Sequence, residues 1–258
     1  MFRRRGSGGR TGVVEVAEPD ALVLDGVGRS YRRGTVVALE PVDLAVPRGR
    51  FLAVMGPSGS GKSTLLQCAA GLDRPTSGTV RIGGVEIAPL REAALTRLRR
   101  ERVGFVFQAH NLVPSLSVLE NVALPLLLGD APDDGRARDA LDSVGLGERG
   151  DDRPTELSGG QQQRVAIARA LVTSPEVVFA DEPTGALDPV TAQDVLALLR
   201  QAVDGDGHTV VMVTHDPAAA AWADEALFLA GGRIAARVER PDSAHVHGIM
   251  RDLGRRAA

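Results

Sequence analysis

Cysteine is almost missing from this 258-residue chain, since Cys68 is the only one. A single thiol excludes a disulfide within the chain and favours a reducing compartment. Cys68 lies one turn after a glycine-rich loop, where a small buried residue is more common than a reactive thiol. We therefore expect Cys68 to belong to the core.

Long apolar runs are also lacking. No stretch reaches 18 uninterrupted apolar residues, so the sequence predicts no membrane-spanning helix. The nearest candidate, 118–128, is short and is interrupted by Glu120, Asn121 and Pro125. The N-terminus carries three consecutive arginines but no apolar run of the kind that a signal peptide has. We expect residues 1–20 to form a disordered, solvated tail rather than a contact with anionic lipid, and the protein to be cytoplasmic.

A surplus of basic charge is the third absence. The chain has 30 Lys and Arg residues and 33 Asp and Glu residues. The resulting net charge of -3 does not indicate the basic surface that nucleic-acid-binding proteins carry. The hydrophobic fraction of 43% is ordinary for a globular protein, so the chain can bury the core of one large domain or of two intimate subdomains. We expect no nucleic acid partner.

Lysine is nearly absent too, since Lys62 is the only lysine among the 30 basic residues. An ammonium is a compact point charge, whereas a guanidinium is a broad planar fork. Only the compact head fits into a tight loop of backbone amides between two phosphates. The lone lysine stands in a run that matches the phosphate-loop pattern G-x-x-x-x-G-K-[ST] and so predicts the binding of a nucleotide triphosphate. The run is Gly56-Pro57-Ser58-Gly59-Ser60-Gly61-Lys62-Ser63-Thr64.

The residues around this loop supply the context that the pattern requires. A β-branched run at 51–55 leads into the loop, and 62–70 reads as a helix. Glycines allow the backbone to approach phosphates, and amides at the helix start present a positive dipole end. We expect Lys62 to neutralise the β- and γ-phosphates and the Ser63 hydroxyl to ligate Mg²⁺. The alternative, a plain glycine turn between a strand and a helix, is disfavoured here.

Strand and helix patterns alternate over most of the chain, which predicts an α/β fold with a mostly parallel sheet flanked by helices. From 115 to 173 the pattern is helical without a clear strand, so a helical insertion interrupts one α/β core. Gly83-Gly84 predicts a hairpin between 79–82 and 85–87. The other expected strands are 21–27, 36–39, 51–55, 103–107, 177–180, 209–213, 226–229 and 233–238, and the expected helices are 62–70, 92–102, 116–128, 136–144, 161–173, 190–202 and 217–223.

Two acidic residues follow the continuous apolar run at 177–180. A strand that is apolar on both faces is buried in a parallel sheet, and open α/β sheets bind ligands at the carboxyl ends of such strands. We expect Asp181 to hold the Mg²⁺ shell and Glu182 to polarise the attacking water. Acids commonly follow strands, but the glycine loop makes the pattern more specific.

The run Leu157-Ser158-Gly159-Gly160-Gln161 precedes a predicted helix. Ser158 and Gln161 match an S-x-x-Q capping box, which any helix can use. Two consecutive glycines in the first turn argue for more, because they cost helix stability and remove side chains from the backbone amides. This pattern favours a second anion seat over a helix cap alone.

Three isolated side chains complete the candidate site. Gln108 and His215 each follow an apolar strand, at the sheet edge expected for Asp181. The amide oxygen of Gln108 could coordinate Mg²⁺ or water, and His215 could donate a hydrogen bond to a γ-phosphate. Tyr31, the only tyrosine, is expected in the loop after the first strand, where it could stack on adenine. The pair of histidines around Val246 reads as an exposed tail rather than a zinc site. Four histidines have no other metal-ligating residue nearby in the sequence at a suitable spacing: His110, His208, His245 and His247.

Taken in order, these segments resemble the ATP-binding cassette (ABC) ATPase family over 22–240. The resemblance implies a P-loop NTPase (RecA-like) core of 21–110 and 174–240, with an N-terminal antiparallel β subdomain, a helical subdomain at 111–173 and a C-terminal tail at 241–258 that contains a short helix. The motifs that carry it are Tyr31 as the A-loop, Gly56 to Thr64 as Walker A, Gln108 as the Q-loop, Leu157 to Gln161 as the signature, Asp181 and Glu182 as Walker B and catalytic glutamate, Ala186-Leu187-Asp188 as the D-loop and His215 as the switch histidine.

The resemblance also implies ATP and Mg²⁺ as the bound groups. It assigns catalysis to Lys62, Glu182 and His215, in a transfer to water that depends on positioning and charge stabilisation. The implied Mg²⁺ ligands are Ser63, Gln108 and Asp181. The implied nucleotide contacts are Tyr31, Gly56, Pro57, Ser58, Gly59, Ser60, Gly61, Lys62, Ser63, Thr64, Gln108, Ser158, Gly159, Gly160, Gln161, Asp181 and Asp188.

Two kinds of partner follow from the resemblance. Two cassettes would stack head to tail, as a homodimer, so that Ser158, Gly159 and Gly160 of one contact the γ-phosphate held by Lys62 of the other. ATP would join the pair and hydrolysis would separate it. The motion would pass to a transmembrane permease at a groove near Gln108, which would hold the protein at the inner face of the cell membrane.

Finer detail resembles the macrolide-export and lipoprotein-release subgroup. Residues 107–122 and 124–128 carry this likeness, and Gly185 agrees with it, whereas His110 stands where the subgroup usually has phenylalanine. The implied function is the ATPase subunit of an exporter with a separately encoded permease. A regulatory cassette of the cell-division type and an importer ATPase remain alternatives. Translation-factor and DNA-repair cassettes are disfavoured by the single cassette, the lack of a long coiled coil and the acidic net charge.

Overall fold

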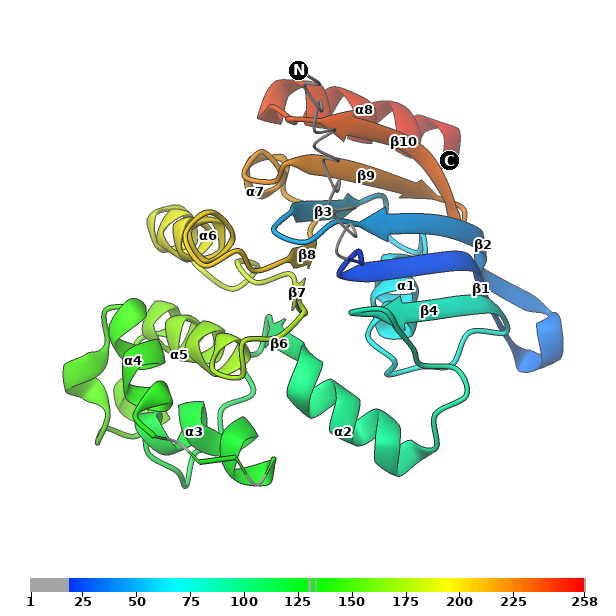
Figure 1. The fold of residues 1–258 in the computed structure, drawn as a ribbon. Coiled ribbons are helices and arrows are strands. Elements are labelled where there is room, and N and C mark those ends of the chain that lie inside the picture. The colour runs from blue at the N-terminus through cyan, green and yellow to red at the C-terminus, as the bar shows by residue number, and fades with distance from the viewer. Residues whose placement is uncertain (1–18, 130, 133, 258) are drawn as a thin grey trace, which may run out of the picture.

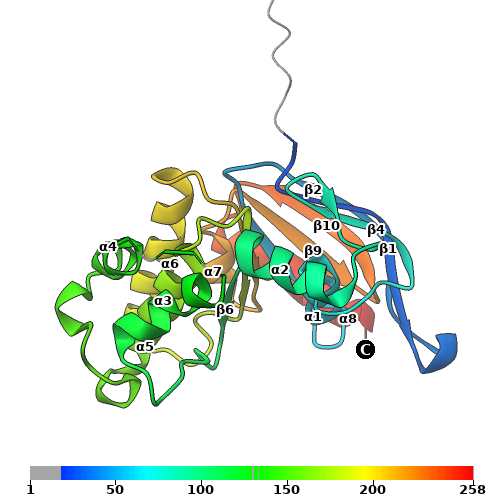
Figure 2. The ribbon, with the colours of Figure 1, turned by 60° about the horizontal axis from the view of Figure 1, so that its bottom comes forward.

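The computed structural model describes residues 19–257 except 130 and 133. Its strands form two sheets, and helices pack on both faces of the larger one (Figure 1, Figure 2). The disordered tail expected at 1–20 lies outside the described residues, apart from its last two positions.

The larger sheet contains the strands that the apolar runs predict. In chain order they are β3 (Phe51–Met55), β6 (Val103–Phe107), β7 (Val177–Asp181), β8 (Val210–Val213), β9 (Glu225–Ala230) and β10 (Arg233–Glu239). The strand order is β10-β9-β3-β8-β7-β6, with parallel pairing except between β9 and β10. The predicted mostly parallel sheet is therefore confirmed.

The described helices agree closely with the predicted ones, and none of them is long and apolar enough to cross a membrane. Apart from the last helix, which lies in the segment expected to be a tail with a short helix, their ends differ from the predicted ends by at most two residues, except that α7 is three residues shorter. They are α1 (Lys62–Ala69), α2 (Glu92–Arg102), α3 (Val118–Leu128), α4 (Arg136–Ser143), α5 (Gly159–Leu171), α6 (Pro189–Asp204), α7 (Pro217–Ala220) and α8 (Ser243–Ala257), and short 3₁₀ turns occupy Arg32–Gly34, Gly147–Arg149 and Pro154–Glu156.

Two hydrophobic cores lie on opposite faces of the larger sheet. Phe51 and Met55 pack into one core with residues of α3, α5, α6 and α8, whereas Leu52 and Val54 pack into the other with α1 and the smaller sheet. Alternate residues of a strand point to opposite faces, so β3 is buried on both sides. This burial explains why the strand reads as a continuous apolar run.

The smaller sheet is antiparallel, in the order β2-β1-β4-β5, with β1 (Leu22–Tyr31), β2 (Val36–Val46), β4 (Ser77–Ile82) and β5 (Val85–Glu86). The first two strands are longer than the expected 21–27 and 36–39. Pro41 lies inside β2, and register shifts in the β1–β2 pairing on either side of it allow the strand to continue. Tyr31 pairs with Val36, so it ends β1 instead of lying in a loop after the strand.

Helices α3, α4 and α5 form a layer beside the sheets, drawn in green in Figure 1. The first of them starts at Val118 because Ser117 caps it, with the Glu120 amide donating to Ser117 Oγ at 3.1 Å and the Ser117 amide donating to the Glu120 carboxylate at 2.6 Å. The helical insertion predicted after Gln108 is therefore present.

The C-terminal segment corrects the expectation of an exposed tail around Val246. The helix α8 has 15 residues, and Val246 is fully buried, while His245 and His247 lie on its exposed side. Among the described residues there is no cluster of three or more His, Cys, Asp or Glu side chains that could hold a metal ion. The histidines of this segment therefore frame a core residue of a helix.

Candidate nucleotide-binding site

The phosphate loop connects β3 to α1 and depends on glycine at two positions. Gly56 has φ 148° and Gly61 has φ 104°, a region that L side chains rarely adopt. A Cβ on Gly56 would lie 2.2 Å from the Leu229 carbonyl oxygen, and one on Gly61 would lie 2.6 Å from that of Ala38. Any side chain at either position would therefore distort the loop.

The lone lysine folds back into this loop. Lys62 Nζ donates to the carbonyl oxygens of Gly56 at 2.8 Å and Pro57 at 3.0 Å. Burial lowers the pKa of Lys62, and the nearby carboxylates of Glu182 and Asp181 raise it in part. A compact cation with acidic neighbours thus lies at the start of α1.

The loop has the features of an anion seat. The Ser60 hydroxyl is buried and has no hydrogen-bond partner among the described residues, and no side chain there caps the amides at the start of α1. No acidic residue stands in the first turn of this helix. Phosphate oxygens would satisfy these donors, because a helix start presents free N–H groups and a positive dipole end. The cavity has a volume of about 260 Å³ and is lined by Ala38, Gly59, Ser60, Gly61, Lys62, Ser63 and Thr64.

The two predicted acids lie at the carboxyl end of β7, as the sequence indicated. Burial and the charge of Glu182 raise the pKa of Asp181, and Lys62 lowers it in part. A bound divalent cation would stabilise the charged carboxylate, and Mg²⁺ prefers carboxylate, amide and hydroxyl oxygens. Asp181 and Ser63 therefore fit the chemistry of a Mg²⁺ site.

Glu182 forms a pair with the predicted His215. Glu182 Oε1 lies 2.8 Å from His215 Nδ1, and Thr214 Oγ1 donates to Glu182 Oε2 at 3.4 Å. The backbone of Glu182 has φ 48°, in the left-handed region, and its amide donates to the Val213 carbonyl oxygen at 2.9 Å. The ends of β7 and β8 thus hold this carboxylate in an unusual but well-anchored conformation.

Gln108 joins the same edge of the sheet. It follows Phe107, which is in register with Asp181 across the β6–β7 pair. The side-chain nitrogen of Gln108 would be 3.0 Å from a Cβ on Gly185, so its amide packs against the turn after Glu182. The structure therefore brings this predicted residue close to the acidic pair.

One contact at this edge was missed by sequence reasoning. Gln163, fully buried in α5, donates through Nε2 to the Phe107 carbonyl oxygen at 3.3 Å. This bond ties the first turns of α5 to the end of β6, one residue before Gln108. The two partners are 56 residues apart, and no local pattern marks the pair.

The structure gives Ser158 to Gln161 a local role. Both halves of the capping box form, with distances of 3.3 Å from the Gln161 amide to Ser158 Oγ and 2.9 Å from the Ser158 amide to Gln161 Oε1. A Cβ on Gly160 would lie 2.1 Å from Thr191 Cγ2, so tight packing against α6 also requires this glycine. Capping by Ser158 and Gln161 and packing by Gly160 therefore account for part of the sequence pattern that favoured an anion-binding site. None of the residues from Ser158 to Gln161 lines the phosphate cavity of the described chain.

Asp188 caps α6. Its carboxylate accepts from the Val190 and Thr191 amides at 3.0 and 3.1 Å and from Thr191 Oγ1 at 2.5 Å. The hydrogen bonds from the Thr191 side chain and backbone lower the pKa of Asp188. Because Thr191 also contacts Gly160, the turn that contains Asp188 is joined to the signature segment.

Tyr31 lies at the end of β1 and is fixed by two residues that sequence reasoning missed. Its hydroxyl donates to Asp73 Oδ2 at 2.9 Å, and the Arg29 guanidinium carbon lies 4.6 Å from the centre of its ring. Asp73 follows α1, the helix that begins at the phosphate loop. No signal in the sequence joins these three positions.

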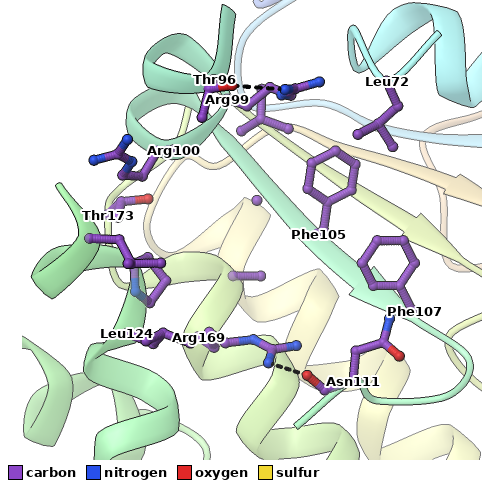
Figure 3. A pocket seen from close by; sticks show the side chains of 15 residues that line it. Leu72, Thr96, Arg99, Arg100, Phe105, Phe107, Asn111, Leu124, Arg169 and Thr173 are labelled. Atoms are coloured by element: carbon purple, nitrogen blue, oxygen red, sulfur yellow. Dashed lines mark hydrogen bonds between the residues drawn. The ribbon is translucent and has the colours of Figure 1, made fainter. Parts of the chain in front are cut away.

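An apolar groove of about 470 Å³ lies between α2, β6, α3 and α5 (Figure 3). Figure 3 shows the stacked rings of Phe105 and Phe107, whose centres are 5.5 Å apart, and the Arg169 side chain reaching Asn111. Arg169 donates to the carbonyl oxygens of Asn111 at 2.6 Å and His110 at 2.8 Å, and both acceptor residues have positive φ. The groove is lined by Leu72, Thr96, Arg99, Arg100, Val103, Gly104, Phe105, Phe107, Asn111, Leu124, Pro125, Leu128, Arg169, Ala170 and Thr173.

Comparison with known proteins agrees with this geometry. The family described as ABC transporter matches residues 39–185. The chain is 50% identical over 218 residues to the macrolide export ATP-binding/permease protein MacB 1/2 of Paracoccus denitrificans, covering 83% of this chain and 32% of that protein. It is 47% identical to the lipoprotein-releasing system ATP-binding protein LolD 1 of Rhodopseudomonas palustris, covering 84% of this chain and 99% of that protein.

A solved structure gives the same result. The ATP-binding cassette MJ0796, described as a dimer in a post-hydrolysis state bound to ADP and Pi, superposes with a TM-score of 0.77 at 41% identity and covers 85% of this chain and 98% of that one. This chain spans about a third of the length of the MacB relative and nearly all of the LolD relative. The phosphate loop, the acids at the end of β7 and these likenesses lead to one assignment: the chain belongs to the ABC transporter family, as an ATP-binding cassette ATPase.

Proposed function

We propose that this chain is the ATP-binding and ATP-hydrolysing part of an ABC exporter that acts through a transmembrane permease. One observation carries the proposal: the phosphate loop and the Glu182–His215 pair share one edge of the sheet. Strand β8 alone separates β3 from β7, so about 10 Å separates the strand that leads into the loop from the strand that ends in the acids. ATP bound in the loop would therefore have its terminal phosphate within reach of Glu182.

The residues around the loop divide the work of binding. Lys62 and the amides at the start of α1 would hold the β- and γ-phosphates, and the unpartnered Ser60 hydroxyl would donate to a phosphate oxygen. Ser63, Asp181 and Gln108 would hold Mg²⁺, which neutralises charge on the phosphates when bound. These contacts position the γ-phosphate and stabilise charge that develops during its transfer.

Hydrolysis would then need only a base and an aligned water. Glu182 accepts the proton of the attacking water as the water oxygen bonds to the γ-phosphorus and the bond to the ADP oxygen breaks. His215 fixes one oxygen of the Glu182 carboxylate, while the other makes a long contact of 3.4 Å with Thr214 among the described residues. Glu182 is thus oriented by His215 and keeps one oxygen available as the base.

A second copy of the chain would complete each site. We expect Ser158, Gly159 and Gly160 of one copy to contact the γ-phosphate that Lys62 of the other holds. The segment does not line the phosphate cavity of its own chain, and the related cassette MJ0796 is described as a dimer. ATP would join the copies, and hydrolysis would release them.

The apolar groove is the proposed contact with the permease. Its lining includes Leu72 and Leu128, which are 46% and 60% exposed, and such exposed apolar side chains mark interaction sites. The groove begins beside Gln108, so a motion there would reach the nucleotide. Binding to a permease would keep the protein at the cytoplasmic face of the membrane.

The export direction rests on the likeness to the MacB and LolD proteins. A regulatory cassette of the cell-division type and an importer ATPase would use the same local chemistry. A neighbouring reading frame with four spanning segments and a large extracytoplasmic domain would support export. A six-segment permease beside a solute-binding protein would overturn it.

The variant Glu182→Gln tests the assigned chemistry. It removes the base but keeps the size of the side chain, so ATP binding and ATP-dependent dimerisation should persist while phosphate release falls by at least about a hundredfold. Glu148→Gln makes the same change at an exposed position and serves as the matched control. Phosphate release at the wild-type rate in Glu182→Gln would remove Glu182 from this role.

A further inference from the structure

Arg29, Tyr31 and Asp73 form a cluster at the end of β1. Arg29 and Tyr31 are two residues apart on a strand and therefore share a face. The guanidinium of Arg29 donates to both oxygens of Asp73, at 2.9 Å from Nε and 2.7 Å from Nη2, and the Tyr31 hydroxyl donates to Asp73 Oδ2 at 2.9 Å. Asp73 thus holds Arg29 in a bidentate pair, which fixes direction as well as distance, and also accepts the hydroxyl of Tyr31.

The cluster covers one face of the tyrosine ring. The guanidinium carbon of Arg29 lies 4.6 Å from the ring centre, within the range of a cation–π contact. Tyr31 remains partly exposed, and the Arg29 and Asp73 side chains are only 21% and 25% exposed. A planar base that stacks on the opposite face would extend a layered arrangement of guanidinium, ring and base.

The carboxylate is also anchored to the helix of the phosphate loop. The amides of Leu72 and Asp73 donate to the Gln67 carbonyl oxygen in α1 at 2.8 and 3.1 Å, and Asp73 Oδ1 accepts from the Arg74 amide at 2.8 Å. The helix starts at Lys62, so a short, hydrogen-bonded path joins the phosphate seat to the tyrosine ring. Asp73 therefore fixes the ring relative to the phosphate loop.

A further residue keeps the strand against this path. The amide and the hydroxyl of Thr76 both donate to the Gly28 carbonyl oxygen, at 2.8 and 3.0 Å, and the hydroxyl accepts from the Ser30 amide at 3.2 Å. The backbone on either side of Arg29 is thus tied to the segment that carries Asp73. Ring, carboxylate and guanidinium belong to one rigid unit.

We propose that Asp73 and Arg29 are positioning residues that hold Tyr31 as a stacking platform for the base of the nucleotide, at a fixed distance from the phosphate loop. The inference rests on the proposed function, the binding of ATP at the phosphate loop, and on the stacking role that the sequence leads us to expect for Tyr31. It assigns base recognition to a three-residue unit, whereas the phosphate seat recognises only the triphosphate. Loss of either positioning residue should therefore weaken binding of nucleotides that carry a base, and leave binding of a bare polyphosphate unchanged.

The test compares ATP with inorganic tripolyphosphate as probes. By calorimetry on the full chain, Asp73→Ala and Arg29→Met should each weaken ATP binding about tenfold, within the range that base stacking on an aromatic side chain contributes. Tripolyphosphate binding should change less than twofold. Arg81→Met, which removes an arginine paired with Glu86 on the same sheet, is the matched control and should leave both affinities unchanged.

Combination with Tyr31→Ala separates the inference from the role of Tyr31 on which it rests. In the Tyr31→Ala background Asp73→Ala should have no further effect on ATP affinity, because the two residues act as one unit. If Tyr31→Ala alone leaves ATP affinity unchanged, the stacking role expected for Tyr31 is wrong, while the proposed hydrolysis of ATP at the phosphate loop is not affected. If Tyr31→Ala weakens ATP binding but Asp73→Ala does not, only the positioning inference is overturned. Equal losses for ATP and tripolyphosphate in Asp73→Ala would also overturn it, because they would indicate a distorted phosphate loop.

Discussion

At the scale of single residues, the site contains charged side chains that lower the free energy of unfolding of the nucleotide-free protein. Burial and Glu182 raise the pKa of Asp181, so its charged form is less favourable in the folded chain than in the unfolded one. Burial lowers the pKa of Lys62, so the charged form of that side chain is disfavoured too. A bound Mg²⁺–nucleotide would favour both charged forms. The site is therefore arranged for its ligand rather than for the stability of the free chain.

The variant Asp181→Asn tests whether the charge of Asp181 lowers the stability of the nucleotide-free protein. A carboxyl whose pKa is raised by folding lowers stability once the pH exceeds its unfolded value, and the full cost is present above the folded value. The variant should therefore raise the midpoint of thermal unfolding of the nucleotide-free protein by roughly 2 °C at neutral pH, while ATP hydrolysis is lost. The difference should shrink as the pH falls toward about 4. A midpoint at neutral pH equal to or below that of the wild type would contradict the assigned cost.

Cys68 provides a second prediction at this scale. The side chain is fully buried, and burial raises the pKa of its thiol to about 11, with Asp73 contributing in the same direction. At pH 8 only about one thiol in a thousand would be ionised, and reagents cannot reach it. We expect no labelling of the folded protein by iodoacetamide over an hour, and complete labelling in denaturant. Rapid labelling without denaturant would show that the region after the phosphate loop opens.

Single residues also show what the sequence could predict. Lys62 and Ser63 were predicted at the start of the helix after the glycine loop, and Asp181 and Glu182 at the end of an apolar strand, because each pair stands in a run with a recognisable order; the structure places both pairs there. Arg29 and Asp73 are 44 residues apart, and their pairing depends on how β1 packs beside the end of α1. Such a contact is a product of the fold and leaves no local pattern.

At the scale of elements, α8 shows how a readable pattern can be passed over. Its buried or partly buried residues Val246, Ile249, Met250 and Leu253 follow the i, i+3, i+4, i+7 spacing of an amphipathic helix. Polar and basic neighbours dilute this pattern, and the two histidines beside Val246 suggested exposure. The core strands were easier to predict, because burial on both faces leaves continuous apolar runs.

Val246→Asp tests the contribution of this helix. Val246 is fully buried in a core shared with β3 and α6, so a carboxylate there would lack both solvent and partners. We expect the free energy of unfolding to fall by about 3 kcal/mol, measured by urea denaturation. His245→Asp introduces the same side chain one residue earlier, on the exposed side, and should change stability by less than about 0.5 kcal/mol. Equal effects of the two variants would mean that α8 does not pack as described.

At the scale of the whole molecule, the fold separates two groups of residues that the proposed function combines. The phosphate loop and the acids share one sheet edge, whereas Ser158 to Gln161 start a helix of the inserted layer and do not line the phosphate cavity of the same chain. The order of strands and helices predicts this architecture, because each element fills a place that its neighbours require. It does not predict which chain supplies the second half of the site.

A mixing experiment decides between one chain and two. Glu182→Gln lacks the base but has an intact signature segment, and Ser158→Arg has an intact base but a blocked signature. If sites form head to tail, each mixed dimer contains one site with both intact halves, so the mixture should release phosphate faster than the two variants separately, up to about a quarter of the wild-type rate for random pairing.

Glu182→Gln mixed with Lys62→Ala is the control, since both changes lie in the same half and every site stays defective. Ser158→Arg removes a helix cap worth about 1 kcal/mol, so its unfolding is measured in parallel. Activity that never exceeds the sum of the separate variants, with both proteins folded, would mean that each chain builds its site alone.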